Sequence, residues 1–187
     1  MNFWTTYNKI LKTKPIFVNT SVGFILGFTG DIICQTIESP QSSQSSQSPQ
    51  RLLSITSFSG IYHGIVNPLI YKTYYKIIPN KIIKTPLQFG ITCSLLDNFV
   101  HVPFLYTPSF FISTSLIQNK SIDTGWELMK EKYIPSLTAC WALWVPLQIV
   151  NFSYIPKHMR PTIVNIGCLV WTIAIDYISH NTISTKN

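Results

Sequence analysis

The stretch "WALWVPLQIVNFSYIPKHMRP", residues 141–161, contains the features that decide the fold of this chain. Its first half is almost wholly apolar, yet the amides Gln148 and Asn151 lie within it and two prolines interrupt it. Trp144, Gln148 and Asn151 are three or four residues apart, which places them on one face of a helix. Such a helix suits a bilayer if its amide stripe faces neighbouring helices and its other faces contact lipid.

Charged residues are scarce along the whole chain. They make up 11% of the 187 residues, while 46% are hydrophobic; soluble domains have about 25% charged residues. Because so few charges cannot cover a soluble surface, the sequence predicts an integral membrane protein. The net charge of +7 would favour nucleic acid on a soluble protein. Here the lysines flank apolar segments, so membrane topology explains the charge better and we expect no nucleic-acid partner.

Four apolar segments are each long enough to cross the roughly 30 Å hydrocarbon core of a bilayer. A fifth segment, residues 162–178, brings the number of spans to five if it also crosses. The sequence therefore predicts an all-α fold, a multi-pass transmembrane helix bundle with four or five spanning helices in a single membrane domain, residues 1–187. The four main segments are residues 16–37, 52–78, 86–117 and 134–155.

The sequence also predicts the structure of the regions between the apolar segments and of the unusually long third segment. The basic, acid-free residues 1–15 predict a short interfacial helix, after which Pro15 suits the first turn of a new helix. Residues 38–51, rich in Ser, Gln and Pro, predict a disordered loop. The third segment is too long for one simple span and predicts a tilt, a kink at Pro103 or Pro108, or an exit from the bilayer. The polar stretch that follows it predicts a short amphipathic surface helix.

Basic residues gather in alternate connections between the apolar segments. The charge is +3 before the first segment, near zero after it, +4 after the second, zero after the third and +2 after the fourth. This alternation is the positive-inside pattern expected if every segment spans. It predicts that the N-terminus faces the cytosol or, in a mitochondrion, the matrix.

Small residues recur four positions apart in three of the segments. Such rows form one ridge on a helix and allow a second helix to approach closely. Close packing inside the bundle and self-association as a homo-oligomer both remain open. The predicted helix-packing positions are Gly23, Gly27, Gly60, Gly64, Gly90 and Ser94.

Polar residues inside the apolar segments are the candidates for a functional site. They either hydrogen-bond neighbouring helices or line a pore. Asp97 is the sharpest case, since a charge near mid-bilayer costs about 2.5–3.5 kcal/mol on the lenient insertion scale. Protonation, pairing with His101 and contact with water are three ways to offset that cost. The candidate polar interior is Asp31, Gln35, Asp97, Asn98, His101, Gln148, Asn151 and Arg160.

Signatures of enzyme, cofactor and metal sites are absent from the sequence. No metalloprotease, hydrolase or phosphate-loop motif occurs. The four cysteines are scattered singly, without the spacing of a metal site or a disulfide framework. We therefore expect no catalytic residue, no cofactor and no bound metal, and we interpret the cysteines as buried apolar residues.

Several motifs resemble those of the peroxisomal membrane protein 2/4 family, which includes inner-mitochondrial and vacuolar members. The family pattern W-x-x-W-P-x-x-Q-x-x-N-F-x-x-V-P-x-x-x-R is met from Trp141 to Arg160, with two exceptions. Val145 replaces its first proline, with Pro146 one place later, and Ile155 replaces its valine. Matching pieces run from the N-terminus to about Ser179. Beyond the C-terminal pattern, they include Trp4, Tyr7, Leu11, Pro15, Gly30, Asp31, Gln35 and Trp171.

This resemblance implies a small all-helical protein with about four spans in a peroxisomal or mitochondrial inner membrane. It also implies channel-like passage of small metabolites or ions, with the lipid bilayer as the constant partner. We therefore predict an organellar membrane protein that forms or regulates a weakly selective small-solute channel. The alternative is a structural scaffold that transports nothing and in which the same polar residues join helices.

Overall fold

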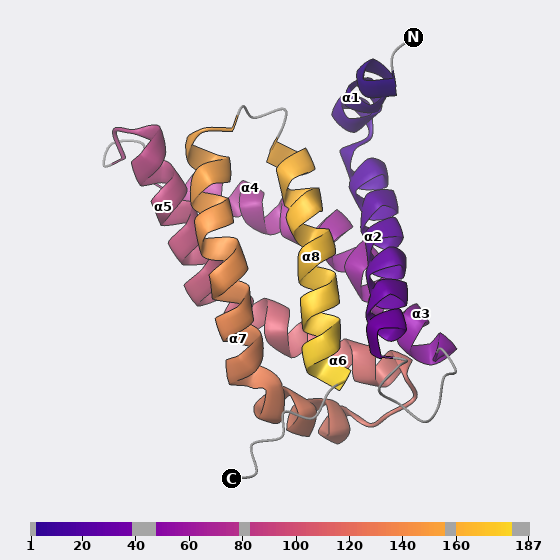
Figure 1. Cartoon of the computed structure of the whole chain (residues 1–187). Coiled ribbons are helices and arrows are strands. Elements are labelled where there is room, and N and C mark those ends of the chain that lie inside the picture. Colours follow the sequence, from indigo (N-terminus) through magenta and orange to yellow (C-terminus); the bar gives the residue numbers. More distant parts are fainter. Residues whose placement is uncertain (1–2, 39–47, 79–82, 156–159, 181–187) are drawn as a thin grey trace.

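The computed structural model describes residues 3–38, 48–78, 83–155 and 160–180, and their regular structure is entirely helical (Figure 1). This confirms the predicted all-α fold class. Two stretches, η2 and η3, are π-helical and continue directly into α-helices on both sides. The elements are α1 (Phe3–Thr13), α2 (Pro15–Glu38), α3 (Pro49–Ile61), η2 (Tyr62–Val66), α4 (Asn67–Ile77), α5 (Pro86–Leu96), η3 (Asp97–Tyr106), α6 (Thr107–Ile117), α7 (Ile122–Ser153) and α8 (Arg160–His180).

Three helical stretches in the described part of the chain are long and apolar enough to cross a membrane: Pro15–Ile37, Pro86–Ile117 and Ile122–Ser153. The predicted segment 52–78 forms the continuous stretch α3–η2–α4, and the predicted segment 162–178 lies within α8. These two remain predicted spans. In Figure 1 the chain runs down along α2, up along α3–α4, down along α5–α6, up along α7 and down along α8. Each predicted segment therefore passes between the two ends of the bundle.

The helix boundaries correct two of the predictions. The predicted disordered loop reaches too far, because Glu38 still belongs to α2 and α3 already begins at Pro49. The Ser48 side chain caps α3 by accepting a hydrogen bond from the Arg51 amide, and Pro49 occupies the first turn, where its missing N–H costs nothing. The predicted surface helix before residue 134 is not separate: α7 runs without a break for 32 residues and contains both Pro135 and Pro146.

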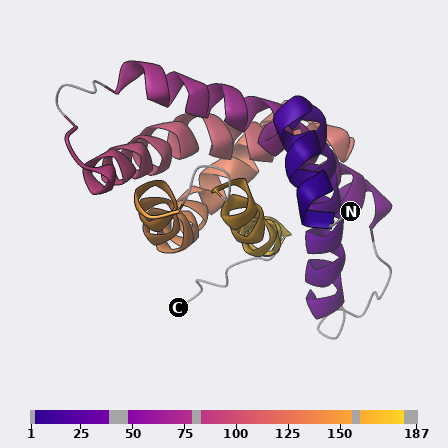
Figure 2. The ribbon, with the colours of Figure 1, turned by 90° about the horizontal axis from the view of Figure 1, so that it is seen from above.

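Helix α7 packs against α5, α6 and α8, while α2 packs against α3 and α8. Seen from above, α7 and α8 lie side by side, with α2 at the edge of the group (Figure 2). The outward surface is strongly apolar, as Phe17 (67% exposed) and Phe104 (71% exposed) illustrate. Buried acids and amides lie inside, so the distribution of polarity suits a bundle surrounded by lipid.

The predicted helix-packing glycines lie at contacts inside the bundle. A Cβ atom at Gly23 would come within 2.8 Å of the Ser59 carbonyl oxygen and 3.0 Å of the Gly60 Cα on α3. The structure thus uses the α2 ridge for close internal packing. Gly90 of α5 meets α7 in a similar way, and the Ser94 hydroxyl donates to the Val145 carbonyl at 3.2 Å.

We expect Gly23→Ala to lower the free energy of unfolding by about 1–3 kcal/mol, because the added methyl meets backbone that cannot move without shifting α3. Gly167→Ala is the matched control: its Cβ would meet side-chain atoms of Trp144 and Leu147 at 3.1–3.3 Å, and these can adjust. Unfolding of both variants in mixed detergent micelles measures the difference. Equal losses would contradict the close α2–α3 contact.

Candidate functional site: two buried polar clusters

The polar residues of the interior gather into two clusters. We define the Arg51 cluster by Asp31, Gln35, Arg51, Asp176 and His180. The Asp97 cluster joins η3 to the helices around it and consists of Tyr62, Tyr71, Tyr74, Asp97, His101, Gln148 and Asn151.

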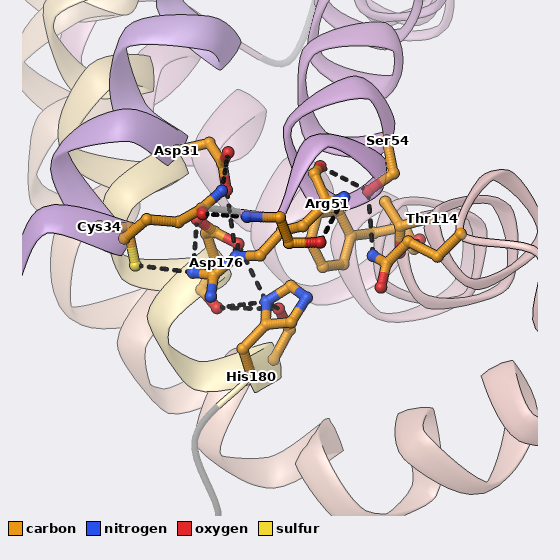
Figure 3. A network of polar contacts seen from close by, with 12 residues as sticks. Asp31, Cys34, Arg51, Ser54, Thr114, Asp176 and His180 are labelled. Atoms are coloured by element: carbon orange, nitrogen blue, oxygen red, sulfur yellow. Dashed lines mark hydrogen bonds and ion pairs between the residues drawn. The ribbon is translucent and has the colours of Figure 1, made fainter. Parts of the chain in front are cut away.

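Arg51 joins three helices at the centre of the first cluster (Figure 3). Its Nε lies 3.1 Å from an Oδ1 atom of both Asp31 on α2 and Asp176 on α8, and its Nη2 lies 3.0 Å from Asp176 Oδ2. Both aspartates are fully buried, and Arg51 is 8% exposed. One guanidinium therefore neutralises part of two carboxylate charges and ties α2, α3 and α8 together.

Neighbouring groups complete the hydrogen bonds of the two aspartates. Gln35 Nε2 donates to Asp31 Oδ2 at 2.6 Å, and its Oε1 accepts from the Ser48 amide at 2.8 Å. His180 Nδ1 lies 3.0 Å from Asp176 Oδ1, one helical turn away on α8. Carboxylates held by several donors can stay charged in a dry interior.

Asp97 opens η3 and is the centre of the second cluster. His101 Nδ1 lies 2.8 Å from Asp97 Oδ1, one turn along the helix. Gln148 Nε2 on α7 lies 3.3 Å from Oδ2, and the hydroxyls of Tyr71 and Tyr74 on α4 approach the carboxylate at 3.4 Å. Asp97 is 4% exposed, so helices α4, η3 and α7 meet around one buried acid.

The hydrogen bonds extend outward from this centre. Tyr62 OH lies 2.9 Å from His101 Nε2. Gln148 Nε2 also donates to Tyr71 OH at 2.9 Å, and Gln148 Oε1 accepts from Asn151 Nδ2 at 3.4 Å. The predicted stripe on α7 therefore faces the bundle interior, where both amides are buried.

The geometry of η3 follows from two prolines five positions apart. In a π-helix, each carbonyl accepts from the amide five residues later. Pro103 and Pro108 have no N–H, so the carbonyls of Asn98 and Pro103 lose these partners. Side chains from α7 replace them: Trp141 Nε1 donates to the Asn98 carbonyl at 2.8 Å, and Tyr133 OH donates to the Pro103 carbonyl at 3.2 Å. Of the two prolines predicted as kink sites, Pro103 lies within this π-helical stretch and Pro108 lies in the first turn of α6.

A cavity of about 30 Å³ lies beside Asp97. A volume of roughly 10–15 Å³ already accommodates a water molecule, so about two or three fit. The buried Oδ1 atom of Asn67 has no hydrogen-bond partner in the described structure. The cavity's polar lining residues are His63, Asn67, Tyr71, Asp97, His101 and Tyr106.

The structure brings together most of the residues that the sequence proposed for the polar interior. Asp31 and Gln35 lie in the Arg51 cluster, and Asp97, His101, Gln148 and Asn151 lie in the Asp97 cluster. Asn98 is buried one residue beyond Asp97, and its side chain donates to the Ser94 carbonyl at 2.9 Å. The side chain of Arg160 lies outside the described part of the chain.

Sequence reasoning missed several members of both clusters. Arg51 falls within the predicted loop, and Asp176 is not among the candidate residues. The signal for Arg51 is the Ser48–Pro49 helix start, which places it in a first helical turn. Tyr62, Tyr71 and Tyr74 give no signal, because aromatic residues in apolar segments are common.

The described residues contain no group of three or more His, Cys, Asp or Glu side chains that could hold a metal ion. The four cysteines are buried thiols. Cys34 accepts a hydrogen bond from Arg51 Nη2 at 3.2 Å, and Cys140 lines the cavity beside Asp97. The two clusters consist of acids, amides, hydroxyls, two imidazoles and the Arg51 guanidinium.

Known proteins resemble the chain over most of its length. Protein SYM1 of Saccharomyces cerevisiae is 27% identical over 176 residues, covering 91% of this chain and 87% of that protein. Peroxisomal membrane protein 2 of Bos taurus is 25% identical, and the alignment covers 88% of this chain and 83% of that protein. Mitochondrial inner membrane protein Mpv17 of Mus musculus is 24% identical, and the alignment covers 96% of this chain and 99% of that protein.

Residues 115–175 match the family model described as Mpv17 / PMP22 family. No solved structure matches the chain. The matched residues include all of α7 and most of α8, the helices that contribute Gln148, Asn151 and Asp176 to the two clusters. With its helical membrane fold and relatives that align along most of its length, the chain is similar to proteins of the Mpv17/PMP22 family.

Proposed function

We propose that this protein lies in a peroxisomal or mitochondrial inner membrane and forms or regulates a weakly selective channel for small solutes. The names of its bovine and mouse relatives support the location. The observation that carries the channel proposal is Asp97, a buried carboxylate beside a water-sized cavity. We further propose that the protein is not an enzyme and that it contacts lipid but not nucleic acid.

A carboxylate is a costly way to join helices within a bilayer. Amides and hydroxyls can bond across helices without a charge, whereas ionisable groups in a span carry a larger desolvation cost and commonly mark ion or solute pathways. The closest polar contact of Asp97 is His101, whose Nδ1 lies 2.8 Å from Asp97 Oδ1. A role in permeation explains why an acid, rather than another amide, occupies the centre of this network.

In the conformation described, we interpret the interior as closed. The cavity volume of about 30 Å³ is far below the several hundred cubic ångströms of a typical small-molecule site. Passage of a solute would require α3–α4 or α8 to separate from α7 or α2. The Arg51 cluster links α2, α3 and α8 and would resist that separation.

Osmotic swelling of reconstituted vesicles tests the proposal. Vesicles containing the wild-type protein should swell in small uncharged solutes, with swelling rates that fall as solute size increases. Asp97→Ala should change those rates, because it removes the charged centre of the proposed pathway. Gly167→Ala, which leaves both clusters intact, is the matched control. Swelling indistinguishable from protein-free vesicles would overturn the proposal.

A second function, a membrane scaffold without transport, is supported by a different observation. The polar side chains of both clusters bond to one another across helices, as structural contacts do. A scaffold predicts that variants in these clusters lower stability or assembly and leave permeability unchanged. Vesicle swelling and unfolding, measured on the same variants, separate the two functions.

A further inference from the structure

Among the residues that line the Asp97 cavity, hydrogen-bond acceptors outnumber the donors available to them. Asn67 Oδ1 is buried and accepts nothing from the described residues. His63 Nδ1 lies 3.2 Å from the Ser59 carbonyl, so that nitrogen carries the hydrogen. Nε2 of the neutral ring then keeps its lone pair. His63 and Asn67 line the same cavity as Asp97.

The charge of Asp97 is also left without a full counter-charge. His101 needs no positive charge for its two contacts, since Nδ1–H of a neutral ring can donate to Asp97 while Nε2 accepts from the Tyr62 hydroxyl. The other side chains bonded to Asp97 in the described structure are two tyrosines and Gln148. With a neutral His101, the ionised Asp97 gives the buried cluster one negative charge, and a buried charge attracts a cation strongly.

The size of the cavity and its apolar lining restrict the kind of cation. About 30 Å³ is space for two or three water-sized groups at roughly 10–15 Å³ each, so an ion with its full hydration shell does not fit. The rings of Tyr106, Trp144 and Trp171 border the cavity, and aromatic faces attract monovalent cations.

We propose that this cavity binds one dehydrated monovalent cation the size of a water molecule, potassium or ammonium. Asp97 supplies the charge and Asn67 Oδ1 supplies an oxygen ligand that otherwise lacks a donor. The ion stabilises the folded bundle by balancing the buried carboxylate. This site does not depend on solute permeation, because a bound ion would be needed in a channel and in a scaffold alike.

Thermal unfolding of the purified full chain in detergent tests the site. The protein is first exchanged into N-methyl-D-glucamine chloride, whose cation is too large for the cavity. Potassium chloride or ammonium chloride then replaces it at constant ionic strength. We expect a saturable rise in Tm of roughly 5–10 °C at a hundredfold excess over Kd. The salt, potassium chloride or ammonium chloride, that gives the larger rise in Tm identifies the preferred ion.

Three variants assign the effect to the cavity. Asp97→Asn, which removes the charge, and Cys140→Met, which fills the cavity and keeps the charge, should both abolish the ion-dependent rise in Tm. Asp176→Asn removes a buried acid from the Arg51 cluster and should retain the rise. The wild-type titration remains decisive even if one variant does not fold. A Tm independent of the cation, or an undiminished rise in Asp97→Asn, would overturn the proposal.

Discussion

Arg51→Leu is expected to lower the free energy of unfolding by about 3–5 kcal/mol, the loss typical when one partner of a buried ion pair is removed. The substitution leaves Asp31 and Asp176 fully buried and close to each other without the guanidinium between them. It also removes the contact that joins α3 to α2 and α8. Unfolding in mixed micelles, monitored by tryptophan fluorescence, measures the loss.

The comparison with Asp31→Asn makes this result specific to charge. The amide introduced by that substitution would keep an oxygen that accepts from Arg51, and Arg51 would still face the carboxylate of Asp176 as a neutral pair. The loss for Asp31→Asn should therefore be clearly smaller than for Arg51→Leu. Equal losses in the two variants would show that shape rather than charge balance stabilises the cluster.

Gln148→Leu is expected to destabilise the protein by about 2–3 kcal/mol. The Gln148 side chain is fully buried, donates to Tyr71 OH at 2.9 Å and lies 3.3 Å from Asp97 Oδ2. Hydrogen bonds to charged groups contribute about 1.5–3 kcal/mol, and removing this donor leaves a buried carboxylate less well satisfied. The loss should appear in the same micellar unfolding assay.

Asn151→Leu is the matched control, one turn further along α7. Asn151 makes a single 3.4 Å contact with Gln148 Oε1, and its own Oδ1 is buried without a hydrogen-bond partner in the described structure. Replacing it removes one weak bond together with one unsatisfied oxygen, so the loss should stay below about 1 kcal/mol. A larger loss for Asn151→Leu than for Gln148→Leu would contradict the network around Asp97.

The sequence predicted the helical class and the direction of the α7 amide stripe because both depend on local periodicity. Spacing along one helix was enough to place Trp144, Gln148 and Asn151 on a common inward face. The i, i+4 pair of Asp97 and His101 was predictable for the same reason. The glycine rows were identified as close contacts, but only the structure showed which helices they meet.

The Arg51 cluster depends on tertiary packing that periodicity does not contain. Arg51 bonds to Asp176, which lies 125 positions away, and no pattern near either residue points to the other. A low-complexity run precedes Arg51 and conceals the helix start at Ser48 and Pro49. The π-helical turn had a signal in the five-residue spacing of Pro103 and Pro108, which interrupts bonding when each carbonyl pairs five residues ahead.

The current through a planar bilayer containing the purified protein tests the central claim most directly. The channel proposal predicts current carried by small ions for the wild-type protein. It also predicts a changed conductance for Asp97→Ala in protein that is shown to be folded by its unfolding transition. No current at any voltage, or a conductance unaffected by Asp97→Ala, would contradict the proposal that the Asp97 cluster lies on a solute pathway.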